Sequence, residues 1–430
     1  MAEGRPDSHP VSLCDGQTIP FARFRAEVAC AAFRLRDCRR GALLCRDSHA
    51  FAVGLFGLLH AGAEVVLPPN GQPGTLACLA GMFDRIVDDE LLGPPAEHGL
   101  PLSPIEPEQA RITFFTSGTT GVPKQVTRTL GMLERELATL DGAWGGELGS
   151  GPVLATVTHQ HLYGLTFKLL WPLAAGRPFD TGTHEVWETL LAALSPGAVV
   201  ITSPAHLTRT GGLPALREAH RPSAVFSAGA PLPAAAAAEA HQVLGRLPIE
   251  IFGSTETGAF ATRRQARGDE DWTLLPGNLL RADAEGRLAL SSPYVPGWTE
   301  TADLVEPRQG GFRFLGRSDR VVKIEGKRVG LAEIEAVLAA LPWIAAAAAV
   351  LLPGRPGRLA AAVVLTDEGR ERLAALGGFR FGRLLCSAMS ARCEPAGRPK
   401  RWRFVEHLPA RAMGKCIDRD VAALFTEDTA

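Results

Sequence analysis

The sequence has no excess of charge of either sign and no pattern of paired cysteines. Its 45 basic and 46 acidic side chains leave a formal net charge of −1. No overall field therefore draws the protein toward nucleic acid or anionic lipid, and we expect no nucleic-acid partner. The eight cysteines include no C-x-x-C pair and have no histidine partners at metal-ligand spacing. This pattern predicts reduced thiols and argues against a structural zinc ion.

Long apolar runs are also missing. No stretch reaches the roughly 20 residues that cross a bilayer, and residues 1–7 lack the basic start and apolar centre of a signal peptide. We therefore expect a cytoplasmic protein without membrane insertion. With 430 residues, of which 46% are hydrophobic and 21% charged, the chain is long enough for more than one core.

Lysine is the scarcest charged residue, with six against 39 arginines. An ammonium group differs from a guanidinium in shape and hydration, so a lysine in such a background indicates a position that needs a compact point charge. Four of the six fall in motif-like stretches. The six are Lys124, Lys168, Lys323, Lys327, Lys400 and Lys415.

The stretch from Arg111 to Lys124 has the character of a phosphate-binding loop. The run Ile112 to Phe115 predicts a buried strand, and it leads into glycines and hydroxyls that end on Lys124. Glycines let backbone N–H groups converge on an anion, hydroxyls add donors, and Lys124 adds a positive charge. Pro123 stands where a Walker loop needs glycine, so the spacing is of another kind. The alternative is a glycine-rich surface turn.

The rest of the chain alternates helix-like and strand-like pieces, which predicts an α/β fold. The expected helices are 21–36, 51–61, 132–140, 165–174, 233–240, 331–341 and 368–376. The expected strands are 41–45, 62–69, 151–158, 198–202, 344–352 and 359–365, and the segments 225–232 and 249–258 are each expected to begin with a strand.

Two further strands end in turns suited to a nucleotide. The segment Val225 to Leu232 ends in a small-residue turn before a polyalanine helix, and nucleotides bind at this edge of open α/β sheets. A plain β-α turn is the alternative. The segment Ile249 to Gly258 ends in a hydroxyl-rich turn that holds one acid, Glu256. One carboxylate beside phosphate oxygens is a suitable site for Mg²⁺.

Downstream segments carry a second set of polar candidates. Asp303 ends a strand-like piece, where its carboxylate can accept hydrogen bonds from both ribose hydroxyls. The charged stretch from Phe312 to Val329 is compatible with an exposed β-hairpin. His161 follows the strand at 151–158, and an isolated histidine is more often structural than catalytic.

Taken in order, these segments resemble the motifs of the acyl-adenylating (AMP-binding) superfamily, which includes acyl-CoA and aryl-CoA synthetases and peptide-synthetase adenylation domains. The resemblance runs from about Arg111 to the end of the sequence. It implies a large α/β domain of stacked sheets and helices at residues 1–317, whose first subdomain, 1–110, is shorter than the family's. A small, mobile α+β domain at 318–430 would follow, with a hinge at Asp319. A short stand-alone bacterial member of the superfamily is the type most resembled.

The resemblance assigns roles residue by residue. It implies that Lys415 is catalytic, that Glu256 binds the metal, and that His161 borders the acyl pocket without acid–base chemistry. Thr255 would touch the α-phosphate, Asp303 and Arg317 would hold the ribose, and Arg328 would join the nucleotide site. The phosphate loop would comprise Thr116, Ser117, Gly118, Thr119, Thr120, Gly121 and Lys124. The adenine would pack on the backbone of Gly229, Ala230 and Pro231 and on Phe252 and Gly253.

Two positions depart from the family pattern: Phe252 replaces the usual tyrosine and Ala302 the usual glycine.

The reaction implied is ATP-dependent activation of an aliphatic or aromatic carboxylic acid, with Mg²⁺, to an acyl-adenylate and pyrophosphate. Transfer to a thiol of coenzyme A or of carrier-protein phosphopantetheine would follow. Two alternatives are an ADP-forming kinase or NTPase and a catalytically degenerate relative that binds nucleotide or acyl ligand. Oligomeric state is not predicted.

Overall fold

The computed structural model describes residues 5–430 except 94–100, 117–123, 269, 325–326, 353–357, 392, 394, 410–417 and 426–430. The chain divides into two compact units. Unit 1 comprises Met1–Leu280 and Leu290–Thr299, and unit 2 comprises Arg281–Ala289 and Glu300–Ala430. The chain therefore crosses between the units three times before residue 300, whereas the sequence-based boundary lies at residue 317. The hinge at Asp319 stays a prediction.

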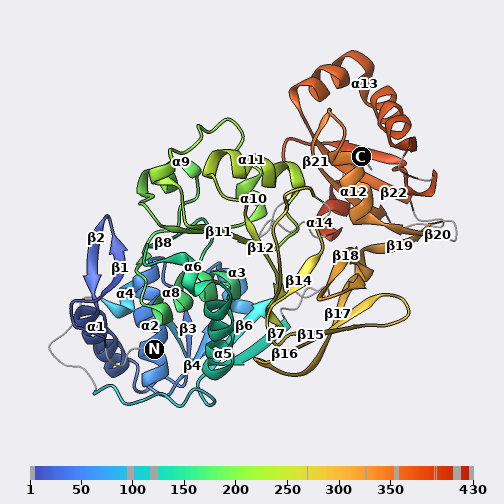
Figure 1. The fold of residues 1–430 in the computed structure, drawn as a ribbon. Helices are drawn as coiled ribbons and strands as arrows, with labels where there is room; N and C mark the ends of the chain where they lie inside the picture. The colour runs from blue at the N-terminus through green and yellow to red at the C-terminus, as the bar shows by residue number, and fades with distance from the viewer. Residues whose placement is uncertain are drawn as a thin grey trace. The chain divides into compact units, whose positions relative to one another are not determined.

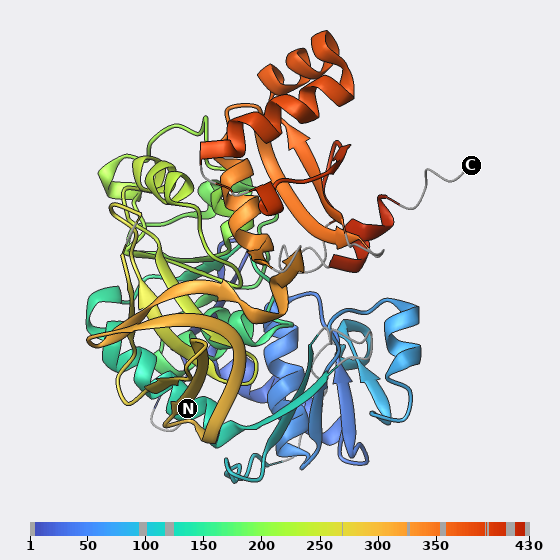
Figure 2. The ribbon, with the colours of Figure 1, turned by 90° about the vertical axis from the view of Figure 1, so that its right-hand side faces the viewer.

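Unit 1 contains a five-stranded sheet in the order β5-β3-β4-β6-β7 (Figure 2). All neighbours are parallel except β6 and β7, which form an antiparallel pair. The strands are β3 (Arg40–Leu43), β4 (Glu64–Leu67), β5 (Arg85–Val87), β6 (Arg111–Thr116) and β7 (Lys124–Thr129). The helices near this sheet in sequence are α1 (Phe21–Arg34), α2 (Ser48–His60), α3 (Pro73–Cys78) and α4 (Asp89–Leu92).

Helix α2 shows why this part of the sequence folds as it does. The Asp47 carboxylate accepts a hydrogen bond from the N–H of Ala50 and so caps the helix. The helix carries apolar residues on nearly all of its sides, and ten of its 13 residues are buried. A helix of that kind is stable only inside a core.

A second sheet has 13 strands, of which those wholly within unit 1 have the order β2-β1-β9-β8-β10-β11-β12-β13-β14. Its strands are β1 (Pro10–Cys14), β2 (Gln17–Pro20), β8 (Val153–Ala155), β9 (Phe179–Asp180), β10 (Val199–Thr202), β11 (Ala224–Ala228), β12 (Ile249–Ser254), β13 (Gly258–Arg263) and β14 (Trp272–Leu274). Its helices and helical turns are α5 (Leu130–Leu140), η1 (Asp141–Gly145), α6 (Gly146–Leu148), α7 (Leu162–Gly164), η2 (Leu165–Leu170), α8 (Trp171–Ala175), α9 (Trp187–Ala193), α10 (Pro204–Leu207), η3 (Glu218–His220) and α11 (Ala234–Leu244).

Alternate residues of β11 face two different apolar layers. Val225 joins a cluster with Leu244 of α11, on the face where Figure 1 shows α9, α10 and α11. Phe226 lies on the other face, 5.5 Å from Phe167 and 5.6 Å from Trp171 between ring centroids. The central strands are therefore buried on both faces, as parallel strands usually are.

Unit 2 is built around a three-stranded sheet of the order β21-β22-β23. Its elements are β18 (Gly311–Arg317), η4 (Ser318–Arg320), β19 (Val321–Ile324), β20 (Lys327–Gly330), α12 (Leu331–Ala339), β21 (Ile344–Leu352), β22 (Arg358–Leu365), α13 (Asp367–Ala388), η5 (Met389–Ala391), η6 (Pro395–Gly397), β23 (Arg401–Phe404) and α14 (Asp418–Ala423). Three strands include residues of both units: β15 (Leu279–Ala282), β16 (Arg287–Ser292) and β17 (Val295–Arg308).

Helix α13 is longer than the sequence predicted. The expected helix ended at Leu376, before a Gly-Gly pair that usually stops a helix. In the structure Gly377 breaks the helix with φ 71° and ψ 158°, and a second helical stretch then continues to Ala388. That stretch places Phe381 and Leu385 in one core cluster with residues of β22. None of the helices in the described residues combines the length and apolar character needed to cross a bilayer.

Candidate active site

The two ends of the predicted phosphate loop are held by the β6–β7 pair. Thr116, the last residue of β6, lies opposite Lys124, the first residue of β7. The loop therefore begins and ends at the same end of this strand pair. Five predicted phosphate-binding residues lie outside the described residues: Ser117, Gly118, Thr119, Thr120 and Gly121.

Lys124 contacts the acid that the sequence proposes as the metal ligand. Its Nζ lies 2.8 Å from Oε1 of Glu256, although the two residues are 132 positions apart. The Lys124 side chain is 61% exposed and the Glu256 side chain 28%. Burial of Glu256 favours its neutral form, but hydrogen bonds from Lys124 and the backbone outweigh that effect and lower the pKa of Glu256. Glu256 is therefore an anion at neutral pH, the state that a hard cation binds.

Glu256 lies in a tight turn between β12 and β13, residues 255–257, which we call the Glu256 turn. The turn is closed by reciprocal hydrogen bonds: the Ser254 N–H donates to Thr257 Oγ1 at 3.0 Å, and the Thr257 N–H donates to Ser254 Oγ at 3.2 Å. A Cβ at Gly253 would come within 2.1 Å of the carbonyl oxygen of Gly258, so only glycine fits there. The sequence motif thus specifies a rigid turn.

The backbone that the sequence assigns to adenine follows β11. Gly229 has φ 99°, which glycine adopts without strain, and Ala230 and Pro231 are exposed. The next residue, Leu232, donates its N–H to Oε2 of Glu250 at 3.0 Å. This loop is therefore tied to β12, the strand that leads into the Glu256 turn.

Glu250 is a buried charge that sequence reasoning missed. It is 2% exposed, and Arg263 donates to its two oxygens at 3.0 and 2.9 Å, while Gln265 donates at 2.6 Å. Its charge inside an apolar strand was the signal available in the sequence. The predicted stacking residue Phe252, two positions on, is half-buried and packs edge-on against Trp272 at 5.3 Å.

The predicted ribose residues belong to unit 2. Asp303 and Arg317 are cross-strand partners on β17 and β18, and Arg317 Nη1 lies 3.3 Å from Asp303 Oδ1. Asp319 lies in η4 and Arg328 in β20. Lys415 lies outside the described residues.

The segment 158–161 combines two buried polar residues, His159 and Gln160, with the predicted pocket residue His161. His159 and Gln160 join the two sheets of unit 1: His159 hydrogen-bonds to Ser48 Oγ and to the carbonyl of Cys45, each at 2.9 Å. Gln160 donates to the carbonyls of Leu43 and Pro68, also at 2.9 Å. His161 is half-buried, and burial lowers its pKa. A neutral imidazole at pH 7 is consistent with a lining role.

The family model for AMP-binding enzymes matches residues 72–288. A 4-coumarate–CoA ligase of Rhodobacter capsulatus is 32% identical over 326 residues, covering 73% of this chain and 76% of the relative. The chain belongs to the AMP-binding enzyme family.

Two other similarities agree with that assignment. A probable non-canonical nonribosomal peptide synthetase of Salinispora arenicola, CymA, is 28% identical over 373 residues, covering 73% of this chain and 5% of the synthetase. The fold resembles an ATP-bound chimera of RpMatB and BxBclM with a TM-score of 0.83 and 19% identity, covering 99% of this chain and 97% of the chimera. This AMP-binding enzyme activates a carboxylic acid to an acyl-adenylate and transfers the acyl group to a thiol.

Proposed function

We propose that the chain is an AMP-forming ligase for an aliphatic or aromatic carboxylic acid, with its triphosphate site at Lys124 and Glu256. The observation that carries this proposal is the 2.8 Å contact between these two side chains. They come from separate motifs, yet one can neutralise phosphate oxygens and the other can bind a cation. Arginine is the usual cation of this sequence, so a lysine at this contact supports a role for a compact charge.

The Glu256 carboxylate fits Mg²⁺. It is ionised, lies on a rigid turn and is accompanied by the hydroxyls of Ser254 and Thr257. Mg²⁺ takes oxygen ligands and commonly binds through one or two carboxylates plus substrate phosphates and water. When bound it would neutralise the negative charge of the triphosphate. The remaining requirements fall on the protein's own residues.

Those residues would act by position and charge and not as nucleophiles. Lys124 would hold the β- and γ-phosphates, and Thr255 would contact the α-phosphate. Lys415 would stabilise the charge that builds between the carboxylate and the α-phosphate. Asp303 and Arg317, which are adjacent on β17 and β18, would bind the ribose.

We propose that the carboxylic acid substrate carries no charged group other than its carboxylate. The proposed pocket segments are 157–167, 227–231 and 253–260. Their one acid is Glu256, the proposed metal ligand, so they hold no other carboxylate to pair with an amino group. An aromatic acid is supported by similarity to a 4-coumarate–CoA ligase. The acceptor would be the thiol of coenzyme A or, as similarity to a peptide synthetase suggests, of a carrier protein.

A panel of aryl and fatty acids, read by nucleotide products, tests this function. We expect acid-dependent formation of AMP and pyrophosphate, and then a thioester when coenzyme A or a phosphopantetheinylated carrier protein is added. Formation of ADP and phosphate would overturn the proposal in favour of a kinase or NTPase. Nucleotide binding without turnover of any acid would favour a catalytically degenerate relative.

A further inference from the structure

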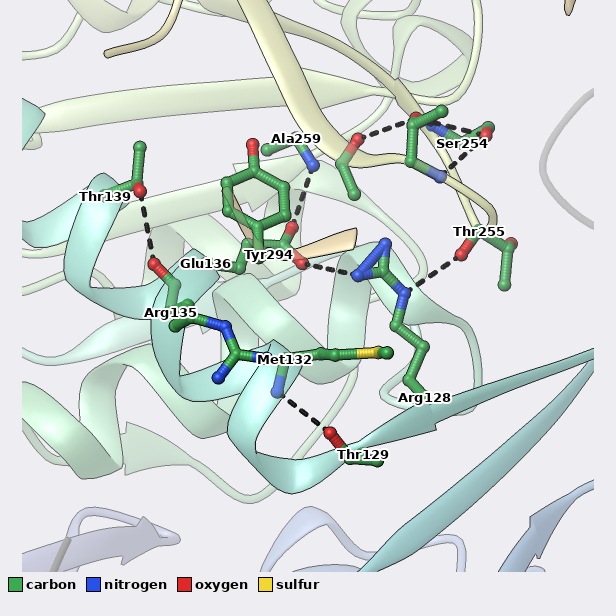
Figure 3. Close-up of polar contacts among 12 residues, drawn as sticks. Arg128, Thr129, Met132, Arg135, Glu136, Thr139, Ser254, Thr255, Ala259 and Tyr294 are labelled. Carbon is green, nitrogen blue, oxygen red and sulfur yellow. Dashed lines mark hydrogen bonds and ion pairs between the residues drawn. The ribbon is translucent and has the colours of Figure 1, made fainter. Parts of the chain in front are cut away.

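Two opposite charges lie buried beside the Glu256 turn, and no role in the proposed reaction accounts for them. Arg128 of β7 is 1% exposed and Glu136 of α5 is 2% exposed. Arg128 Nη1 lies 3.7 Å from Glu136 Oε2 (Figure 3). Both residues lie in unit 1.

The pair contacts the main chain on both sides of Glu256. Arg128 Nε donates to the carbonyl of Thr255 at 3.2 Å, directly before Glu256. Glu136 Oε1 accepts the N–H of Ala259 at 2.8 Å, three residues after it (Figure 3). The two contacts therefore fix the entry and the exit of the turn.

The strand β7 connects this pair to Lys124. Successive side chains of a strand alternate between faces, so residues 124, 126 and 128 share one face. The pairing of β7 with β6 is regular throughout β7. From that face Lys124 reaches the side chain of Glu256 and Arg128 reaches the backbone of Thr255. One strand thus sets the position of the lysine and of the turn that carries the acid.

The chain packs closely on Glu136 where the turn enters β13. Gly258 has φ 72°, and a Cβ there would meet Glu136 Oε2 at 2.7 Å and Tyr294 Cε2 at 2.9 Å. Thr257, beside it, is 3% exposed. The turn therefore packs directly on the carboxylate of Glu136, with no space between them for a side chain.

A purely structural role does not explain the free-energy cost of burying Arg128 and Glu136. Within the described residues neither Nη atom of Arg128 donates a hydrogen bond, and Glu136 Oε2 accepts none. Burial raises the pKa of Glu136, and the charge of Arg128 opposes that effect. Buried ion pairs of this kind can often be replaced by apolar side chains without loss of stability. The hydrogen bonds that the two side chains do make go to Thr255, inside the Glu256 turn, and to Ala259, two residues beyond it.

We propose that Arg128 and Glu136 are positioning residues that hold the Glu256 carboxylate at the place where it binds a metal–triphosphate complex. This inference rests on the proposed function of Glu256. It predicts that removing the pair weakens metal-dependent binding of nucleotide while metal-independent binding and the fold persist.

Binding of α,β-methylene-ATP, measured by calorimetry with Mg²⁺ and with EDTA, tests the inference without turnover. For the Arg128→Met/Glu136→Leu variant we expect the affinity gained from Mg²⁺ to fall by about 10-fold or more, as for outer residues of metal sites. The affinity in EDTA should stay unchanged. The control is Arg135→Met. This substitution removes an exposed arginine that pairs with Glu108 and that lies, like Glu136, on α5.

The outcomes separate this inference from the proposed function. A wild-type protein that gains no affinity from Mg²⁺ would overturn the metal role of Glu256 and the inference with it. A folded double variant that keeps the wild-type gain would overturn the inference alone. If the double variant does not fold, Arg128→Lys provides the test, because it keeps the buried charge but lacks the Nε that bonds to Thr255. We expect it to lose part of the Mg²⁺ gain, and full retention would contradict the inference.

Discussion

At the scale of single residues, two charged pairs near the Glu256 turn differ in burial. Lys124 and Glu256 are partly exposed, so their mutual contact can be exchanged for contacts to phosphate and metal. Arg128 and Glu136 are almost fully enclosed, so neither can leave the other cheaply. The exposed pair is suited to binding a ligand, and the buried pair to holding the backbone.

Replacing Glu256 by Gln removes the charge of the side chain and keeps its shape. Because the amide is a weak ligand for Mg²⁺, we expect acid-dependent pyrophosphate release to fall by about 10²-fold or more, with little change in thermal stability. Steady-state assays over a range of Mg²⁺ concentrations measure the effect. Glu188→Gln, an exposed acid on α9, is the control. Equal loss in both variants, or none in either, would contradict a metal-binding role.

The sequence could locate Lys124 and Glu256 because each stands where a strand meets a glycine-rich turn. It could not reveal Arg128 or Glu136. A charged residue in a strand or helix usually faces solvent, and only the three-dimensional packing shows that these two side chains meet inside the protein. Glu250 differs from them, because its position inside an apolar strand was a signal that the sequence carried and that was missed.

At the scale of elements, the two sheets of unit 1 are joined by polar side chains as well as apolar packing. His159 is 1% exposed and hydrogen-bonds to Ser48, the first residue of α2, and to Cys45, three residues before it. Burial, and secondarily the charge of Lys168, lowers the pKa of His159 from 6.5 to about 3. The native contact therefore requires the neutral imidazole.

This shift predicts acid sensitivity. Between pH 6.5 and about 3 the unfolded chain binds a proton at His159 that the native chain does not, so the stability contributed there is complete above pH 6.5 and is lost as pH falls. The slope is at most about 1.4 kcal/mol per pH unit. Urea unfolding of wild type and His159→Asn at pH 7, 6 and 5 measures it. We expect a shallower decline in the variant, and parallel declines would contradict the assignment.

Most central elements were predictable because their strands are continuous apolar runs bounded by turn residues. Strand Ile344–Leu352 was predicted with the bounds that the structure gives. The hairpin β1–β2 was missed, although Asp15 and Gly16 have the positive φ values, 49° and 75°, typical of an Asp-Gly hairpin turn. The helical stretch after Gly377 was missed because local sequence indicates a stop, and only burial of Phe381 reveals its continuation.

At the scale of the whole molecule, the residues proposed for the reaction are divided between the two compact units. Lys124 and Glu256 belong to unit 1, whereas Asp303, Arg317 and the position of Lys415 belong to unit 2. The proposed reaction therefore requires unit 2 to supply Lys415 for adenylation. We further propose that rotation about Asp319 withdraws it before thiol transfer. The two half-reactions should then differ in their dependence on Lys415.

The most direct measurement is exchange of labelled pyrophosphate into ATP without thiol, for wild type and Lys415→Ala. We predict exchange that requires a carboxylic acid in the wild type and a loss of about 10²–10³-fold in the variant. The variant should still form thioester from supplied acyl-adenylate. Absence of acid-dependent exchange in the wild type, with every acid tested, would contradict the central claim that this chain activates carboxylates as acyl-adenylates.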